Sequence, residues 1–222
     1  NAGADAYNVA VGFGAGELMT TGADNVIIGG LAGDALTTGS NNVAIGKEAL
    51  STEDAHGNNV AVGYRALKTQ NAGADAFNVA VGKDAGLSVT TGIHNTLVGG
   101  LAGDNLAGGS HNVAIGSYAL STEDTHGKNV AIGYSALILQ NAGADAYNVA
   151  IGYNAGQAVT TGNYNILIGG TAGDALTTGN ENIAIGFSAL GAEDSGGKNI
   201  AIGYKSLEVL DAGADGNNVA VG

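Results

Sequence analysis

The sequence contains no cysteine, no proline and no tryptophan, and only 12% of its residues are charged. The lack of cysteine excludes disulfide scaffolds and cysteine-ligated zinc or iron–sulfur sites. Glycine without a strict three-residue period, in a chain without proline, excludes a collagen triple helix. No apolar run approaches the roughly 18 residues that indicate a membrane-spanning helix. We therefore expect no insertion into a membrane.

Positive charge is also scarce. Seven Lys and Arg residues stand against 20 Asp and Glu residues, so the formal net charge is −13. Binding to nucleic acid requires cationic side chains that neutralise phosphates, and anionic lipid surfaces likewise attract basic segments. The charge balance argues against both kinds of partner. It is typical of a soluble surface that resists self-association, with scattered binding of divalent cations as the alternative.

Repetition is what the chain does contain. The 40 glycines among 222 residues far exceed the roughly 7% of average proteins. The segment 1–12 returns nearly unchanged at 71–82 and at 141–152, and in part at 211–222. We predict a single repeat array over 1–222, because a fixed period of this kind is the signature of a repeat architecture. Its units are 1–70, 71–140, 141–210 and the partial unit 211–222, which indicates a segment of a longer fibre.

A five-residue motif, Asn-(Val/Ile/Thr)-x-(Val/Ile)-Gly, occurs thirteen times within this array. Its copies are evenly spaced from Asn8 through Asn25 and Asn42 to Asn59, a slightly longer step leads to Asn78, and the cycle then repeats with the long unit. Val9 and Val11 lie two positions apart, so on a strand they share one face and Ala10 takes the other. The Asn and Gly that bracket each strand tolerate turn backbone. The structural motif is represented by Asn8, Val9, Val11, Gly12, Asn25, Asn42, Ile45, Gly46, Asn59, Asn78, Asn148 and Asn218.

The spacing predicts an all-β fold. Apolar residues two positions apart, with a glycine every few residues, favour strands over helices. Coils of one motif period that return to their start would each advance by about 4.8 Å, which predicts a parallel β-solenoid. In each coil we expect the motif strand, a turn, a shorter strand around the small residue seven positions after the Asn, and a longer turn. The interior of one chain would be thin, and we expect three chains to bury the faces of Ala10 and its counterparts in a homotrimer.

The motif copies also carry a family resemblance. Asn42-Val43-Ala44-Ile45-Gly46 resembles the repeats of trimeric autotransporter adhesin heads, which are left-handed parallel β-rolls wound as trimers. The wider unit, as in 27–46, is similar to the repeat shafts of bacteriophage tail fibres, including those of phages of marine bacteria. The resemblance covers essentially the whole chain. It implies a left-handed β-roll in a homotrimeric fibre, located in the virion tail fibre and contributing to host attachment. The alternative is a bacterial surface adhesin or extracellular filament, and coils longer than those of adhesin heads imply longer outer loops.

Candidate chemistry is sparse. Catalysis needs a base beside a nucleophile or paired carboxylates, and we expect neither enzyme activity nor a cofactor. His56 and His126 share a loop position that is Gly196 in the third unit, and we interpret both as solvated loop histidines. Glu53-Asp54 and its counterparts are interpreted as charged turns that limit aggregation, with calcium binding as the alternative. The segment 29–34 faintly resembles a calcium-binding nonapeptide. The calcium candidates are Asp34, Asp104, Asp174, Glu53 and Asp54.

Two further surface features leave alternatives open. Thr-Thr-Gly segments, as at Thr20-Thr21, are interpreted as turns because adjacent residues alternate in direction, and an ice-binding face is the remote alternative. Aromatic residues recur before and after the motif, as at Phe77 and Tyr134. We expect them to cap the edge of the roll or to fill gaps between chains, and exposed clusters could also stack on sugars. Besides further copies of the chain, the expected partner is a host-cell receptor or polysaccharide.

Overall fold

A computed structural model describes residues 6–222 of the chain. Two compact units make up the chain, Asn1–His111 and Asn112–Gly222. The elements of the described part are all short strands, so it has no helix that could span a membrane. The first unit contains β1 (Val9–Val11), β2 (Val26–Ile28), β3 (Val43–Ile45), β4 (Val60–Val62), β5 (Val79–Val81) and β6 (Thr96–Val98). The second contains β7 (Val113–Ile115), β8 (Val130–Ile132), β9 (Val149–Ile151), β10 (Ile166–Ile168), β11 (Ile183–Ile185), β12 (Ile200–Ile202) and β13 (Val219–Val221).

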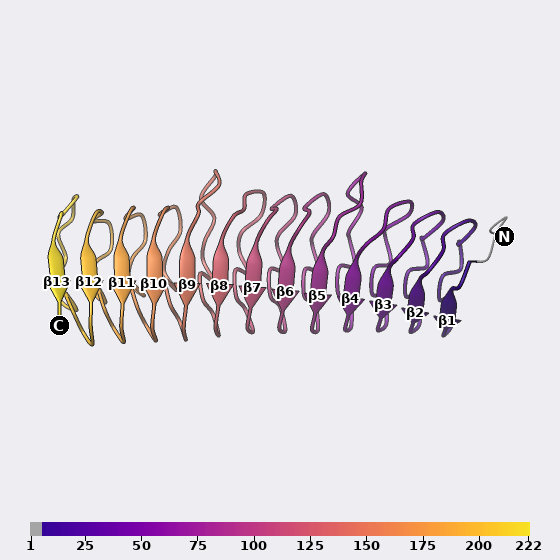
Figure 1. Ribbon diagram of the computed structural model, residues 1–222, viewed down its shortest axis with the longest axis horizontal. Helices are drawn as coiled ribbons and strands as arrows, with labels where there is room; N and C mark the ends of the chain where they lie inside the picture. Colours follow the sequence, from indigo (N-terminus) through magenta and orange to yellow (C-terminus); the bar gives the residue numbers. More distant parts are fainter. Residues whose placement is uncertain (1–5) are drawn as a thin grey trace. The chain divides into compact units, whose positions relative to one another are not determined.

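Within each unit the strands pair in chain order and run parallel, so each coil adds one strand to a sheet (Figure 1). Val26 of β2 lies opposite Val43 of β3, one coil of the shorter length further on. Val60 of β4 lies opposite Val79 of β5, one coil of the greater length further on, and the added length extends the loop before β5. Figure 1 shows this loop and the one before β9 reaching beyond the loops of neighbouring coils. The predicted all-β parallel solenoid is confirmed in both units.

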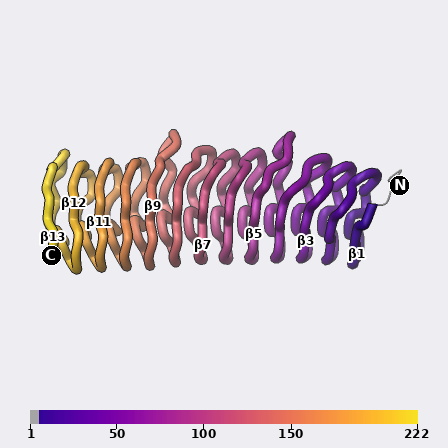
Figure 2. Tube along the Cα trace, in the orientation of Figure 1, coloured from indigo at the N-terminus to yellow at the C-terminus, as the bar shows by residue number. Residues whose placement is uncertain are grey.

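The segment that follows each strand is a series of turns, so the predicted second strand is wrong. After β2, Gly29 has a φ of 133°, and Leu31 and Gly33 have φ values of 56° and 49°. The N–H of Ala32 donates to the carbonyl of Gly29 at 3.3 Å, whereas that of Gly33 donates to Ala49 in the next coil at 2.9 Å. Left-handed residues at alternate positions bend the chain repeatedly, which an extended strand cannot do. Figure 2 shows the backbone of each coil curving back toward the next strand.

The two faces of each strand are the reverse of our prediction. Ala44, in the middle of β3, is 0% exposed, whereas its neighbours Val43 and Ile45 are partly exposed. The Ala face therefore points into the coil, and the Val and Ile face points outward. The reason lies in the turns, because Ala49 and Leu50 fill the interior from the opposite side and are themselves buried. Only a methyl group fits in the space left beside the strand.

The large inward side chain comes from the strand in some coils and from the turn in others. In the coil of β2 the strand contributes Ile27 and the turn contributes Gly33, whereas in the coil of β3 the strand contributes Ala44 and the turn contributes Leu50. A Cβ atom on Gly33 would lie 3.1 Å from Cδ1 of Ile27 and 2.9 Å from Cδ1 of Leu36. A large side chain on one wall thus requires a small one on the other, as close packing demands. No described coil has a large residue at both positions.

A buried column of asparagine side chains runs along the inside of each unit. The backbone N–H of Asn25 donates to Oδ1 of Asn8 at 2.8 Å, and that of Asn42 donates to Oδ1 of Asn25 at 2.9 Å. The other end of each amide closes its own coil, since Nδ2 of Asn25 donates to the carbonyl of Gly39 at 2.9 Å. In the second unit, the N–H of Asn129 donates in the same way to Asn112 at 3.0 Å. The motif asparagines therefore link coil to coil as well as bordering the strands.

Candidate functional site

An apolar surface follows the sheet of each unit. We call outer stripe the outward residues that flank the middle of each strand. In the first unit they are Val9, Val11, Val26, Ile28, Val43, Ile45, Val60, Val62, Val79, Val81, Thr96 and Val98, with Thr96 as the one polar side chain. In the second they are the first and last residues of β7 to β13, and all of them are Val or Ile. Ile28 is 36% exposed and Ile166 37%, so even inner coils of each unit leave this surface open in the single chain.

The outer stripe is smaller than the interface that stable association between copies requires. Six strands at about 4.8 Å spacing and about 10 Å length span roughly 290 Å² in the first unit, and seven strands span roughly 340 Å² in the second. An uncharged patch of about 300–600 Å² is the largest that a typical monomer exposes, and such patches often mark binding surfaces. A stable interface buries about 800 Å² on each partner. The stripe therefore needs the rows beside it to complete an interface.

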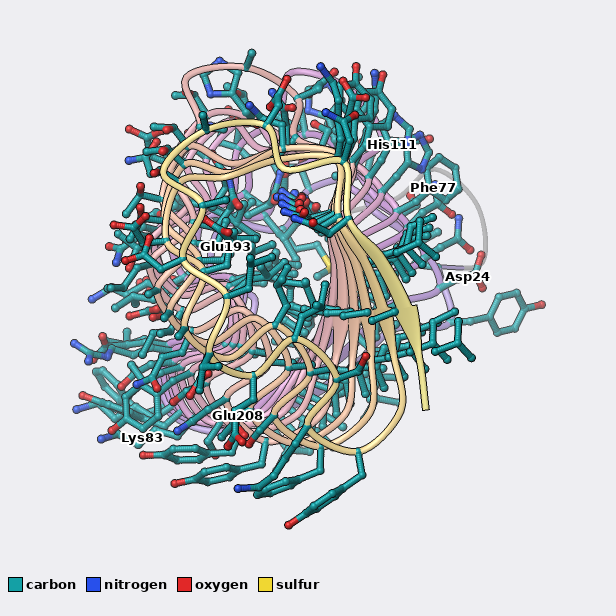
Figure 3. All side chains as sticks on the ribbon, turned by 90° about the vertical axis from the view of Figure 1, so that its left-hand side faces the viewer. Asp24, Phe77, Lys83, His111, Glu193 and Glu208 are labelled. Carbon is teal, nitrogen blue, oxygen red and sulfur yellow. The ribbon has the colours of Figure 1, made fainter. Side chains whose placement is uncertain are left out.

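One such row consists of the residues that immediately precede the motif asparagines. Phe77, His94 and His111 have φ values of 52°, 58° and 60°. Their rings stack from coil to coil, with centroids 5.5 Å apart for Phe77 and His94 and 5.0 Å apart for His94 and His111. Figure 3 shows Phe77 and His111 on the outside of the coil. In the second unit Tyr147 and Tyr164 stack at 5.3 Å. Aromatic side chains therefore extend the apolar surface at these coils only, because the same position is polar or charged in others, as at Asp24 and Lys128.

A second aromatic row follows the glycines that end the strands. Tyr134 stacks on Tyr153 with centroids 5.5 Å apart, and Phe187 stacks on Tyr204 at 5.7 Å. Tyr153 and Tyr204 are 59% and 69% exposed. These aromatic residues form stacks between adjacent coils. Capping of the roll edge and filling of gaps between chains stay predictions. Binding of sugars by these rings stays a prediction.

The candidate calcium ligands fall into two classes. Three groups bring ligand atoms within 4.8 Å of one another in the described part of the chain: Glu53, Asp54 and His56; Glu123, Asp124 and His126; and Glu193, Asp194 and Asp211. Asp34, Asp104 and Asp174 belong to none of these groups. Burial raises the pKa of each of these three aspartates, and that of Asp104 to about 6. Each offers a single carboxylate, whereas calcium takes six to eight oxygen ligands.

Glu53 does not contribute an exposed charge to the turn that we expected to limit aggregation. Its side chain is 0% exposed, because it takes the inward position that Leu36 occupies in the preceding coil. His56 is likewise not a freely solvated histidine, since its side chain is only 28% exposed and its Nδ1 lies 3.4 Å from Oε1 of Glu53. Figure 3 shows the equivalent Glu193 on the inner side of the backbone. The sequence signal for this arrangement is the Glu-Asp-x-His spacing, which occurs in the first two 70-residue repeats, at 53–56 and 123–126.

The threonine turns are used for bonds between coils. The hydroxyl of Thr20 donates to the carbonyl of Thr37 at 3.0 Å, and the hydroxyl of Thr37 donates to that of Asp54 at 2.8 Å. Thr177 donates in the same way to Asp194 at 2.9 Å. These donors are engaged by the protein itself, which does not favour an ice-binding face.

The outer stripe recurs in every described coil of each unit, whereas the aromatic stacks and the acidic loops occur in some coils only. A surface of this kind gains strength from the number of coils that take part, because repeated weak contacts add up along the array. Comparison of the chain with protein-family models, with curated proteins and with solved structures gives no match.

Proposed function

We propose that the chain is a structural segment of the shaft of a bacteriophage tail fibre, in which three copies associate through their outer stripes. The observation that carries this proposal is the uncharged column of Val and Ile along the sheet of each unit. Identical copies share the same order of shorter and longer coils, so their stripes match coil by coil. Burial of this surface would stabilise the assembly through the hydrophobic effect. The number of three copies, the left-handed winding and the phage origin follow from the sequence resemblance.

The bonding between coils supports a role as a stiff support. Parallel strand pairing joins each coil to the next, and the asparagine column adds a second line of hydrogen bonds inside the coil. Each coil also contributes its own interior contacts, so stability grows with the number of coils. Such a shaft would hold host-binding parts away from the virion. The exposed aromatic stacks would add weak contacts to a host receptor or polysaccharide, which become effective when many act together.

The alternative proposal is that the chain belongs to a bacterial trimeric surface adhesin or extracellular filament with the same architecture. The resemblance of Asn42-Val43-Ala44-Ile45-Gly46 to adhesin-head repeats favours it. The two proposals share the trimeric shaft and differ in the particle that carries it. Immunogold electron microscopy with an antibody against this chain would distinguish them, because the label would decorate phage tails in one case and bacterial surfaces in the other.

The assembly itself is tested by the mass of the chain in solution. Light scattering and mass photometry in native buffer are expected to give three times the 21.5 kDa mass of one chain. A particle of one chain, at concentrations up to the micromolar range, would contradict the trimeric shaft. A particle of two chains would keep the outer stripe as an interface but would contradict the threefold arrangement.

A further inference from the structure

The buried carboxyl group of Glu53 is only half satisfied. Its Oε1 accepts a hydrogen bond from the N–H of His56 at 3.0 Å, whereas its Oε2 is buried and has no hydrogen-bond partner. Gln70 takes the same inward position in the next coil and is bonded at both ends, from Nδ2 of Asn78 at 2.7 Å and to the carbonyl of Thr90 at 3.1 Å. A buried carboxylate without such partners is destabilising unless a cation or a proton compensates it. The fold therefore places an acid where a neutral or apolar residue would serve the interior better.

The imidazole of His56 is in a similar situation. Its Nδ1 is buried, has no hydrogen-bond partner, and lies 3.4 Å from Oε1 of Glu53. A charge-assisted hydrogen bond between these atoms would be about 2.7–2.9 Å long. Two ligands of one tetrahedral zinc ion, with bonds of about 2.0–2.2 Å, are about 3.4 Å apart. The separation thus fits two ligands that face a common metal ion, and the carboxylate of Asp54 completes the group within 4.8 Å.

We propose that the loop 53–56 binds a divalent transition-metal ion of the zinc class through Glu53, Asp54 and His56. A site with one imidazole and two carboxylates suits zinc or nickel, whereas calcium takes oxygen ligands alone and in larger number. The bound ion would compensate the buried carboxylate and would join the loop to the interior of the coil. This site does not depend on the trimeric shaft, because its three ligands come from one loop of one chain.

The 70-residue repeats 71–140 and 141–210 each contain a counterpart of this loop, and the three loops can be compared. In the second unit Oε2 of Glu123 is also buried without a partner, and burial raises the pKa of this carboxyl group. Nδ1 of His126 lies 3.8 Å from Oε1 of Glu123, and the hydroxyl of Thr125 lies 3.0 Å from the same nitrogen and competes with a metal. We therefore assign a second, weaker site to Glu123, Asp124 and His126.

The third 70-residue repeat, 141–210, has no histidine in this loop, and both carboxylate oxygens of its Glu193 have hydrogen-bond partners. Gly196 stands at the histidine position, and its N–H donates to Oε1 of Glu193 at 2.6 Å. The N–H of Ala212 donates to Oε2 at 3.0 Å, so both carboxylate oxygens have backbone partners. Where the histidine is missing, the protein thus satisfies the carboxylate by itself. This unit serves as an internal control without a zinc-class site.

The test is titration of the full chain with Zn²⁺ alone by isothermal calorimetry. The starting protein carries His94→Gln and His111→Gln, because this stacked pair of exposed imidazoles could also bind the ion. We expect two equivalents per chain with unequal affinities. His56→Gln should remove the tighter one and His126→Gln the weaker one, each with a loss of more than about 100-fold, beyond the 10–100-fold effect of a residue outside the ligand set.

A second variant separates binding from folding. Glu53→Gln keeps the shape of the side chain, and glutamine already occupies this inward position at Gln70, so without metal the chain should fold and should melt at the same or a higher temperature. It should nevertheless lose the tighter equivalent while His56 is intact. In ¹⁵N spectra of the starting protein, Zn²⁺ should shift the ring resonances of both His56 and His126. Absence of saturable heat, binding that survives His56→Gln, or Ca²⁺ binding as tightly as Zn²⁺ would each overturn the assignment.

Discussion

On the inner side of β3 a single methyl group, that of Ala44, contacts the interior, while Val43 and Ile45 project from the other side of the same three residues. Residues on the inner side must fit the enclosed volume and must leave the asparagine amides with their hydrogen-bond partners. The outer side is limited by neither, and it carries the larger apolar residues. The difference teaches that the interior decides the stability of a single chain, whereas the outer stripe is available for association. Substitutions on the two sides should therefore change different measurements.

The largest effect is expected inside, at the asparagine column. Nδ2 of Asn148 donates to the carbonyl of Gly162 and to Oε1 of Gln140, both at 2.7 Å, and its Oδ1 accepts from the N–H of Asn165 at 2.8 Å. Asn148→Leu leaves these three buried groups without partners, so the free energy of unfolding should fall by about 4 kcal/mol. Urea unfolding measures it. The exposed Asn141→Leu is the control and should stay within about 0.5 kcal/mol; a loss below about 1 kcal/mol at Asn148 would contradict the role of the column.

The next largest effect is expected from the packing of the strand side chain against the turn inside one coil. Leu97 is fully buried, and Leu97→Ala should cost about 3 kcal/mol because it leaves a cavity. A Cβ atom on Gly103 would lie 2.7 Å from Cδ1 of Leu106 and 2.8 Å from Cδ2 of Leu97, so Leu97→Ala relieves only one of the two contacts. The φ of 55° at Gly103 is close to the 50° and 48° of Leu50 and Leu67 at the equivalent position. Gly103→Leu should therefore destabilise the protein alone but restore part of the loss in the double variant. Additive energies in this double-mutant cycle would refute the complementarity.

A smaller effect is expected at Asp104, a partly buried residue of the turn after β6. Burial raises the pKa of this carboxyl group from 3.8 to about 6, so the folded chain holds its proton more tightly than the unfolded chain does. Stability should therefore be lost as the pH rises from about 4 to about 6, and it should stay at the lower level above that range. Asp104→Asn should stabilise the protein at pH 7 by about 1 kcal/mol, after allowance for partial exposure, and should have no effect below pH 4. Thermal melts across this range measure it, with the exposed Asp24→Asn as the control. Equal melting shifts of Asp104→Asn at pH 3.5 and 7 would contradict the assignment.

The sequence predicted the coils better than it predicted their faces. The spacing of the motif copies led to the parallel solenoid and to the longer loops before β5 and β9. Alternation of apolar residues shows which side chains share a face, but the volume supplied by the turns decides which face is inside. That contribution was hidden because Leu50 adopts a φ of 50°, which a leucine rarely does. Glu53 was missed for a related reason, since glutamate is seldom fully buried and its position in the turn did not reveal that it points inward.

The smallest effect on the single chain should come from the outer stripe, and it should also be the most informative about function. Ile45 and Val62 lie opposite each other on β3 and β4, and both project outward. Ile45→Lys together with Val62→Lys adds two charges that water solvates in the monomer, so its free energy of unfolding should change by about 0.5 kcal/mol or less. In a trimer the same charges would be buried against partner chains, which is strongly unfavourable. Mass photometry should therefore show the variant as single chains, while Thr91→Lys, in an exposed turn, keeps the trimer. If the stripe variant stays trimeric, the chains associate through another surface, and if it unfolds, the stripe is needed for the folding of the single chain.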